Sequence, residues 1–438
     1  MGVTISKVEG LEGIDSRPNP NTMARVTLSD GTVAYAMSPS GASTGEKEQH
    51  EKRDGDAERY GGKGVLCTVE AIEKMVAPAL IGMSPFDLAE VDEVMCSLDT
   101  SGNLSQIGAN TTTAVSYAVA KAAASSRGQE LFEFLGGPTA CRLPVPHCKF
   151  MDGGLHARNG LRIQEFMWVP VGAPTFAEAV RWLVETFHAL REILHEDGHP
   201  TTLGDEGGFA PQLMSNEEAL VYGMRAIEKT GRKPGEHMCL SLDPAASAFF
   251  KDGQYQVEPT GDPLAGEALV NYWVALVDKF PIISIEDGVA ENDKPTWIRM
   301  FARLGHRIQL VGDDIFCTNP DLLAKSLPPN PRFANSMLDK TNQWGTVTRA
   351  LRAGQLAMQH GMTVVVSQRS GDTEFGHYAD IAVAGGFSGI KPGSVARSDR
   401  GAKYNRLLWI EHLLGNRAVY PGWKAFTSVP ALYAKGVN

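Results

Sequence analysis

The chain has 438 residues and carries 41 Lys and Arg against 51 Asp and Glu, which gives a net charge of −10. An acidic chain without a basic block is a poor candidate for binding nucleic acid or an anionic membrane. Apolar residues make up 43% of the sequence, enough for a large buried core, and the length suggests two to three domains. The unusual count is glycine, at 46 residues with no fixed period.

Neither the N-terminal residues nor the cysteine spacing indicates a secreted or disulfide-rich protein. The N-terminus lacks a basic region followed by an apolar run, and no window approaches the ~18 consecutive apolar residues of a membrane span. None of the six cysteines forms a CxxC pair. We therefore expect reduced thiols in a cytoplasmic protein with no membrane association.

The first part of the chain mixes predicted strands and helices. Short β-type runs at residues 25–28 and 32–37 flank Ser29-Asp30-Gly31, which predicts a hairpin. Helical patterns follow at residues 69–80 and 106–127. Gly136-Gly137-Pro138 then interrupts the pattern, so we expect one domain at residues 1–137 and a second at residues 138–438.

Beyond this break, short apolar runs are followed by polar residues and, in most cases, by a helical pattern such as 264–279, 345–360 or 399–414. Apolar strands that alternate with helices are typical of parallel βα units. A doubly wound sheet would gather polar residues mainly at its switch point, so polar residues after six successive strands favour a (β/α)8-type barrel with a site at its C-terminal mouth. The six runs are residues 239–242, 282–285, 308–312, 336–339, 363–367 and 389–390.

Three carboxylates, Asp243, Glu286 and Asp313, follow three successive predicted strands. Three hard oxygen ligands without an accompanying Cys or His suit Mg²⁺. A single such residue would more simply be a helix cap or a surface charge. Three in register, followed by lysines at later strand ends, favour a metal site.

Lys340 and Lys391 follow later strands of the same predicted barrel. A lysine that faces a dication and another lysine should have a lowered pKa and act as a base, although a structural ion pair with a carboxylate is the alternative. Glu165 and Glu206, the latter in the glycine-rich loop 204–208, are candidate acids. Together these residues form a set for removing a proton beside a carboxylate.

Another loop of small residues, 39–45, has the wrong spacing for a nucleotide phosphate loop, because Gly45 is followed by Glu46 and not by Lys. A lid that closes over the barrel mouth fits this loop better.

The chain resembles the enolase family across nearly its whole length. The motifs that carry the resemblance are PSGASTG at residues 39–45, RDGD at 53–56, QEFM at 164–167, GDEGGFAP at 204–211, NEEAL at 216–220, SIEDG at 284–288, VGDD at 311–314 and RSG at 369–371, together with matches within 342–346 and 396–405.

The resemblance implies a small N-terminal α+β domain, a β/α barrel and a homodimer or an octamer of dimers. It also implies a small anionic phosphorylated substrate and reversible dehydration of 2-phosphoglycerate to phosphoenolpyruvate with two Mg²⁺. By motif match, Lys340 would be the base and Glu206 the acid, assisted by Glu165. The implied ligands of the first Mg²⁺ are Asp243, Glu286 and Asp313, Ser43 on the lid would reach the second, and the substrate would contact His156, Gln164, Gln368, Arg369, Ser370 and Lys391.

Departures from the family pattern cluster near the site. Gln368 stands where the family has a histidine near the departing hydroxyl, and an amide cannot carry a proton charge. Asp339 replaces an apolar residue before the base, and Asp152 replaces the Asn of an Asn-Gly-Gly motif. Three hypotheses stay open: an ordinary enolase, a specialised relative such as a carboxyphosphonoenolpyruvate synthase of phosphonate biosynthesis, and an inactive scaffold protein.

Overall fold

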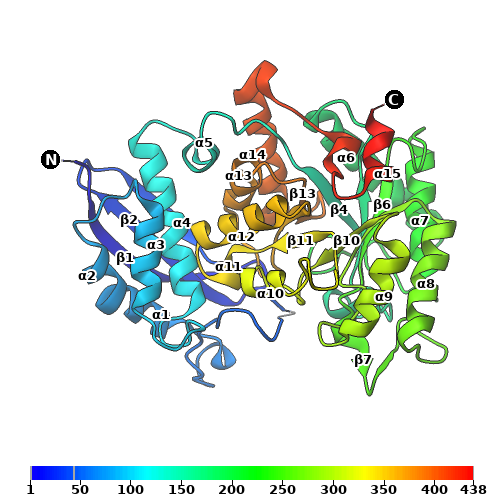
Figure 1. The fold of residues 1–438 in the computed structure, drawn as a ribbon, viewed down its shortest axis with the longest axis horizontal. Coiled ribbons are helices and arrows are strands. Elements are labelled where there is room, and N and C mark those ends of the chain that lie inside the picture. The colour runs from blue at the N-terminus through cyan, green and yellow to red at the C-terminus, as the bar shows by residue number, and fades with distance from the viewer. Residues whose placement is uncertain (1, 43–44, 438) are drawn as a thin grey trace.

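A computed structural model describes residues 2–42 and 45–437, so the predicted metal ligand Ser43 lies outside the described residues. The N-terminal part contains an antiparallel sheet of β1 (Ile5–Ile14), β2 (Pro20–Leu28) and β3 (Val33–Met37), and the predicted hairpin between β2 and β3 is confirmed. The alanine-rich helix α4 (Ala109–Ser126) packs against this sheet and is buried over most of its length (Figure 1). Small side chains allow this close packing.

Shorter helices complete the N-terminal part. The helix predicted at residues 69–80 is present as three consecutive segments, α1, η2 and α2, the last with Pro78 in its first turn. The predicted division at residues 137 and 138 stays a prediction; it lies in the chain between α5 and β4. The elements are η1 (Tyr60–Gly62), α1 (Leu66–Ala71), η2 (Ile72–Val76), α2 (Ala77–Leu80), α3 (Leu88–Ser97) and α5 (Leu131–Gly136).

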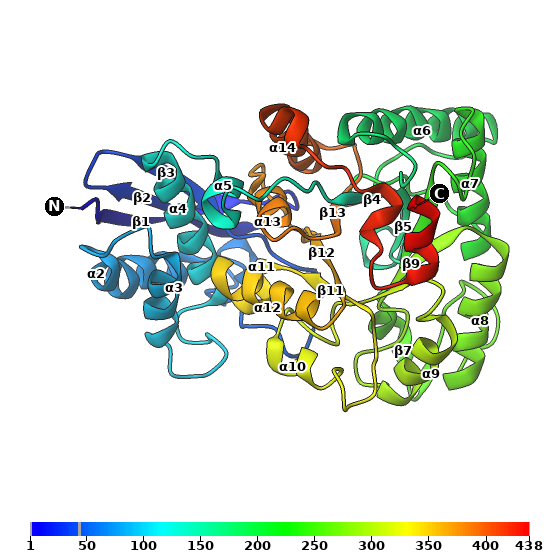
Figure 2. The same ribbon diagram turned by 45° about the horizontal axis from the view of Figure 1, so that its top comes forward.

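The rest of the chain forms a closed barrel whose strands follow chain order around the ring (Figure 2). All six predicted strands are present, and each pairs in parallel with its neighbours in that run. The sequence patterns missed the first two barrel strands, and the second of them, β5, runs antiparallel to both β4 and β6. The strands are β4 (Val145–Asp152), β5 (Glu165–Val169), β6 (Cys239–Asp243), β9 (Ile282–Glu286), β10 (Gln309–Gly312), β11 (Ser336–Asp339), β12 (Thr363–Ser367) and β13 (Gly389–Gly393).

The reversed direction of β5 matters for the site. Because β5 is antiparallel, its first residue, Glu165, lies at the same end of the barrel as Asp152 and Asp243, the last residues of the neighbouring strands. An acid from the start of one strand thereby joins acids from the ends of others.

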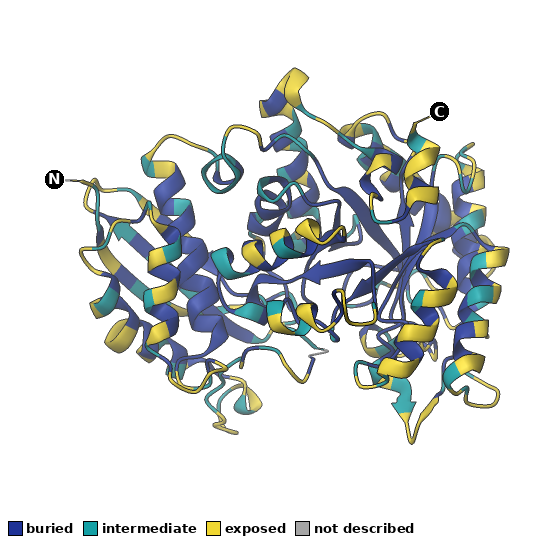
Figure 3. Ribbon diagram, in the orientation of Figure 1, coloured by how far each residue is buried: buried dark blue, intermediate teal, exposed yellow. Residues whose placement is uncertain are grey.

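Helices surround the barrel and bury one face against it, while their outer faces are exposed (Figure 3). The three helices predicted after the barrel strands are confirmed within two residues at each end. No helix in the described ranges combines the length and apolarity needed to cross a bilayer. The main helices are α6 (Phe176–Glu196), α7 (Asn216–Lys229), α8 (Gly266–Lys279), α9 (Lys294–Leu304), α10 (Pro320–Ala324), α11 (Thr341–Trp344), α12 (Val347–Gln359), α13 (His377–Ala384), α14 (Ser398–Leu414) and α15 (Pro430–Tyr433).

Hydrogen bonds join helix α4 to the barrel beside Lys340. The hydroxyls of Thr112 and Thr113 donate to the backbone carbonyl of Gly345 at 2.7 and 2.9 Å. The hydroxyl of Tyr117 lies 2.8 Å from that of Thr341, directly after Lys340. The N-terminal part therefore supports the loop that carries the predicted base.

Candidate active site

The barrel mouth holds a cavity that brings together side chains from distant parts of the sequence. Most of the site residues predicted from the sequence line it, including the proposed base, both proposed acids and all the proposed substrate contacts. The lining residues are Gly41, Ala42, His156, Gln164, Glu165, Glu206, Asp243, Ala245, Asp287, Asp313, Asp314, Lys340, Ser367, Gln368, Arg369, Ser370 and Lys391.

The three predicted metal ligands are buried at the ends of β6, β9 and β10. The Lys391 ammonium lies between two of them, 2.8 Å from Asp243 Oδ2 and 2.6 Å from Glu286 Oε1. Burial and the neighbouring Asp243 raise the pKa of Glu286 well above its usual range. A divalent cation would remove this electrostatic cost, so the donor set fits Mg²⁺.

A second acidic group adjoins the first. Across the described part of the chain, the groups of three ligand-type residues whose atoms all lie within 4.8 Å of one another are Asp287–Asp313–Asp314 and His156–Glu165–Glu206. The predicted ligands Asp243, Glu286 and Asp313 do not all lie within that distance of one another. Their carboxylates surround the ammonium groups of Lys340 and Lys391. Burial raises the pKa values of Asp287 and Asp314 well above the usual range, and repulsion adds to it, from Asp314 and Asp313 at Asp287 and from Asp313 at Asp314.

Lys340 is buried after β11, and its ammonium donates to the Oδ2 atom of Asp313. Gln343 donates to the other oxygen of Asp313 at 2.7 Å. Burial is the largest single effect and opposes the ammonium form, but the attraction of carboxylates, Asp313 first and Glu286 after it, leaves the pKa of Lys340 raised. We expected a dication beside Lys340 to lower the pKa of its ammonium. In the structure the partner of Lys340 is a carboxylate, which has the opposite effect on that pKa.

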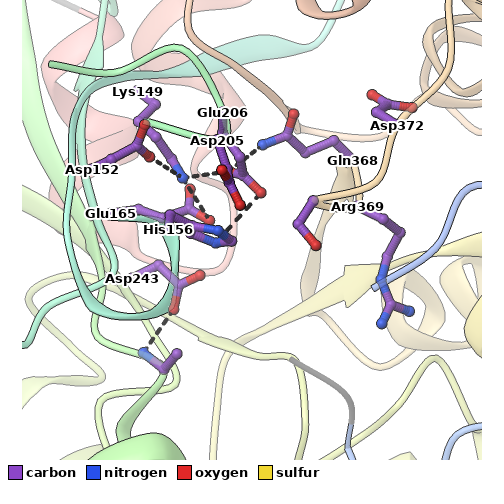
Figure 4. Close-up of polar contacts among 12 residues, drawn as sticks. Lys149, Asp152, His156, Glu165, Asp205, Glu206, Asp243, Gln368, Arg369 and Asp372 are labelled. Carbon is purple, nitrogen blue, oxygen red and sulfur yellow. Dashed lines mark hydrogen bonds and ion pairs between the residues drawn. The ribbon is translucent and has the colours of Figure 1, made fainter. Parts of the chain in front are cut away.

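On another side of the cavity, the ammonium of Lys149 lies among three carboxylates (Figure 4). Its Nζ atom is 3.0 Å from Asp152 Oδ1 and 3.4 Å from Glu165 Oε1, and it donates to Glu206 Oε2. The Lys149 side chain, on β4, has no exposed surface. Burial raises the pKa of Glu165 to about 7 and that of Asp152 to about 6, against the attraction of Lys149.

Glu206 has the opposite electrostatic balance from Glu165. Burial alone would raise the pKa of Glu206, but the adjacent His156 ring, the cations Lys149 and Arg400 and the hydrogen bond from Lys149 hold it well below its usual range. Burial lowers the pKa of His156 itself to about 3, so at neutral pH the imidazole is uncharged, with Nε2 3.5 Å from Glu206 Oε1. The cations that keep Glu206 ionised are therefore Lys149 and Arg400.

Gln368 connects Glu206 to Arg400. Its amide nitrogen donates to Glu206 Oε2 at 2.5 Å, and its amide oxygen accepts from Arg400 Nη1. Arg400 also donates to the backbone carbonyls of Arg369 and Ser370 at 2.8 Å each. The buried guanidinium thus fixes both the amide of Gln368 and the loop after β12.

Arg369 and Ser370 reach the cavity from the same loop. Arg369 Nη1 lies 2.8 Å from Glu48 Oε2, which links the barrel to the segment after the predicted lid. A β-carbon at position 41 would collide with the Arg369 guanidinium, so Gly41 permits the close approach of that segment. This contact accounts for one of the glycines that were abundant in the sequence.

Sequence reasoning did not assign site roles to Lys149, Arg400 and Glu48, nor to Asp287 and Asp314, which directly follow two of the predicted metal ligands. Lys149 lies in β4, a strand that was not predicted. Arg400 lies in the stretch 396–405, which was used only for the resemblance. A charged residue inside an otherwise apolar run was the available signal for Lys149. Glu48 gave no separate signal, because its contact with Arg369 forms only in the folded chain.

The sequence matches two family models that together span almost the whole chain. Residues 5–135 match "Enolase, N-terminal domain", and residues 140–429 match "Enolase, C-terminal TIM barrel domain". The chain belongs to the enolase family. The predicted family and fold class are confirmed, and membership supports an enolase-superfamily enzyme, with acidic clusters in the barrel mouth that could hold metal ions. The individual roles of the site residues stay predictions.

Proposed function

We propose that the protein is a Mg²⁺-dependent enolase-type enzyme that removes the α-proton of 2-phosphoglycerate or a close analogue and forms phosphoenolpyruvate or a related enolpyruvate. One relationship carries the proposal. Strands β11 and β5 are four strands apart in either direction around the closed barrel, so Lys340 and Glu165 face one cavity from opposite sides. A base and an acid on opposite sides of a bound substrate suit proton abstraction with departure of a group from the neighbouring carbon.

Asp243, Glu286 and Asp313 would hold Mg²⁺, which supplies charge stabilisation for a carboxylate that becomes an enolate dianion. Lys391 keeps its charge, since its carboxylate neighbours raise its pKa well above the usual range despite burial. It therefore serves as a fixed cation for an anionic substrate and not as a base.

The proposed substrate is a small phosphorylated anion. Arg369 supplies a planar guanidinium suited to a phosphate or carboxylate, and the Ser370 hydroxyl lies beside it in the cavity lining. Lys340 would accept the α-proton in its neutral amine form, which a Mg²⁺ ion held by Asp313 would favour because it replaces the ion pair of Asp313 with the Lys340 ammonium. Its burial keeps water from competing with the substrate for this amine.

The second candidate is a specialised relative, such as a carboxyphosphonoenolpyruvate synthase. The observation that favours it is Gln368, whose amide occupies the side of Glu206 where the family has a titratable imidazole. The changes lie at Gln368, on the leaving-group side, and at Asp339, directly before the base, while the carboxylates and lysines for proton abstraction are present.

Exchange of the α-proton of 2-phosphoglycerate in D₂O tests the proposal without assuming which group departs. We expect deuterium incorporation with the wild-type protein and Mg²⁺, and loss of incorporation when a chelator removes the metal. An absence of exchange at saturating 2-phosphoglycerate and Mg²⁺ would contradict the proposed activity on this substrate.

A further inference from the structure

Glu206 is surrounded by hydrogen-bond donors. Its Oε2 atom accepts from the ammonium of Lys149 and from the amide of Gln368, the latter at 2.5 Å. Its Oε1 atom lies 3.5 Å from His156 Nε2. A carboxyl group that receives several donors is favoured in its ionised, acceptor-only form.

The position of Lys149 is fixed by the strands on either side of it. Lys149 and Asp152 are both on β4, with Nζ and Oδ1 3.0 Å apart, and Glu165 on the adjacent β5 lies 3.4 Å from the same ammonium. None of the Lys149 side chain is exposed. Its charge is therefore held against Glu206 by the barrel wall.

The orientation of Gln368 is also determined. Its amide oxygen accepts from Arg400, which as an arginine can only donate. The amide nitrogen must then point to Glu206. Gln368 cannot turn its amide oxygen to accept a hydrogen bond from a protonated Glu206 without losing the hydrogen bond that it accepts from Arg400.

We propose that Lys149 is a positioning residue that, together with Gln368, keeps Glu206 ionised. Glu206 then accepts a hydrogen bond from a substrate hydroxyl and does not supply the proton that a departing hydroxide needs. The inference rests on the proposed function. It assigns to the site substrates whose hydroxyl is retained or used as a proton donor, and it makes dehydration slow relative to proton abstraction.

The consequence for the reaction can be written in full. Lys340 breaks the α-carbon–hydrogen bond, takes the proton and leaves the electron pair on the enolate. Expulsion of hydroxide would break the β-carbon–oxygen bond, and the leaving oxygen would need a proton that ionised Glu206 lacks. Glu165, whose Oε1 atom lies 3.4 Å from Lys149 Nζ, is then the remaining acid in the cavity, so hydroxide departs slowly and its departure is not abolished. The enolate instead recovers a proton, or in D₂O a deuteron, from Lys340, which restores the substrate with label at the α-carbon.

The ratio of dehydration to α-proton exchange tests the role of Lys149. In the wild type with Mg²⁺ and 2-phosphoglycerate, we expect exchange to exceed dehydration by ~10-fold or more, since an effective acid contributes at least that factor. In Lys149→Met, one of the carboxyl groups around the vacated position becomes protonated, and the ratio of dehydration to exchange should rise by ~10-fold. That ratio should fall as the pH rises from 6 to 8, and Lys149→Arg should restore the low wild-type ratio.

Comparable dehydration and exchange rates in the wild type, or an unchanged ratio in folded Lys149→Met, would overturn the inference and leave the proposed function intact. An absence of exchange would instead contradict the proposed function. If Lys149→Met fails to fold, Gln368→Met removes the second donor to Glu206 and should raise the ratio in the same direction; an unchanged ratio there is equally decisive against the inference.

Discussion

Gln368 donates a hydrogen bond from Nε2 to Oε2 of Glu206 at 2.5 Å, and this contact joins the loop after β12 to the glycine-rich loop that carries the predicted acid. The amide replaces a side chain that could carry a proton with one that cannot. The mouth of the barrel thus keeps the residues for taking a proton from carbon but changes those near the departing group.

Gln368→His tests whether this replacement limits dehydration. An imidazole beside Glu206 can exchange a proton with the leaving hydroxyl, so dehydration of 2-phosphoglycerate should rise by ~10-fold or more relative to α-proton exchange. A coupled assay for phosphoenolpyruvate and deuterium incorporation measured on the same sample give the two rates. An unchanged ratio would show that Gln368 is not the departure that limits dehydration.

The fold was largely predictable because its strands are short apolar runs that end in polar residues. The patterns at residues 239–242 and 282–285 predicted β6 and β9, and a parallel barrel followed from their repetition. The antiparallel direction of β5 was not predictable, because Glu165 begins a fully buried strand with no alternation of polar and apolar residues. Direction depends on pairing with β4 and β6, which a local pattern does not contain.

The site was predictable in its members but not in its contacts. Asp243, Glu286 and Lys391 were expected near one another, and they are. Their arrangement as an ion-paired group depends on side-chain packing in three dimensions. The contact of Lys149 with Glu206 joins residues 57 positions apart, and only the closed barrel brings them together.

Mg²⁺ should stabilise the folded protein through the carboxylates at the ends of β6, β9 and β10. A ligand that binds only the folded state at 100 times its Kd adds ~2.7 kcal/mol to the free energy of unfolding. We expect calorimetry to show a higher Tm with Mg²⁺ than with a chelator, and Glu286→Gln to lose most of this shift. Glu267→Gln, at an exposed position on α8, is the matched control and should keep it. Equal shifts in Glu286→Gln and the wild type would contradict the assigned site.

Asp339 should make stability depend on pH. Burial raises its pKa from 3.8 to about 7, and neither of its carboxylate oxygens has a hydrogen-bond partner in the described structure. The folded state keeps this proton up to about pH 7, whereas the unfolded chain releases it near 3.8. The free energy of unfolding should therefore fall as the pH rises between these values, by up to roughly 4 kcal/mol from this group.

Urea titrations from pH 4 to 8 measure this effect. In Asp339→Asn the group no longer titrates, so its stability relative to the wild type should increase with pH across that range. Asp252→Asn, in an exposed turn, is the control and should follow the wild-type curve. Parallel curves for Asp339→Asn and the wild type would show that Asp339 does not have the raised pKa.

The most direct test of the central claim is deuterium incorporation at the α-carbon of 2-phosphoglycerate by Lys340→Ala in the presence of Mg²⁺. Lys340 is the base in our account, so the substitution should reduce exchange by ~10³-fold or more while the variant still binds the substrate. Exchange by Lys340→Ala at a rate close to that of the wild type would contradict the account, because another group would then remove the proton.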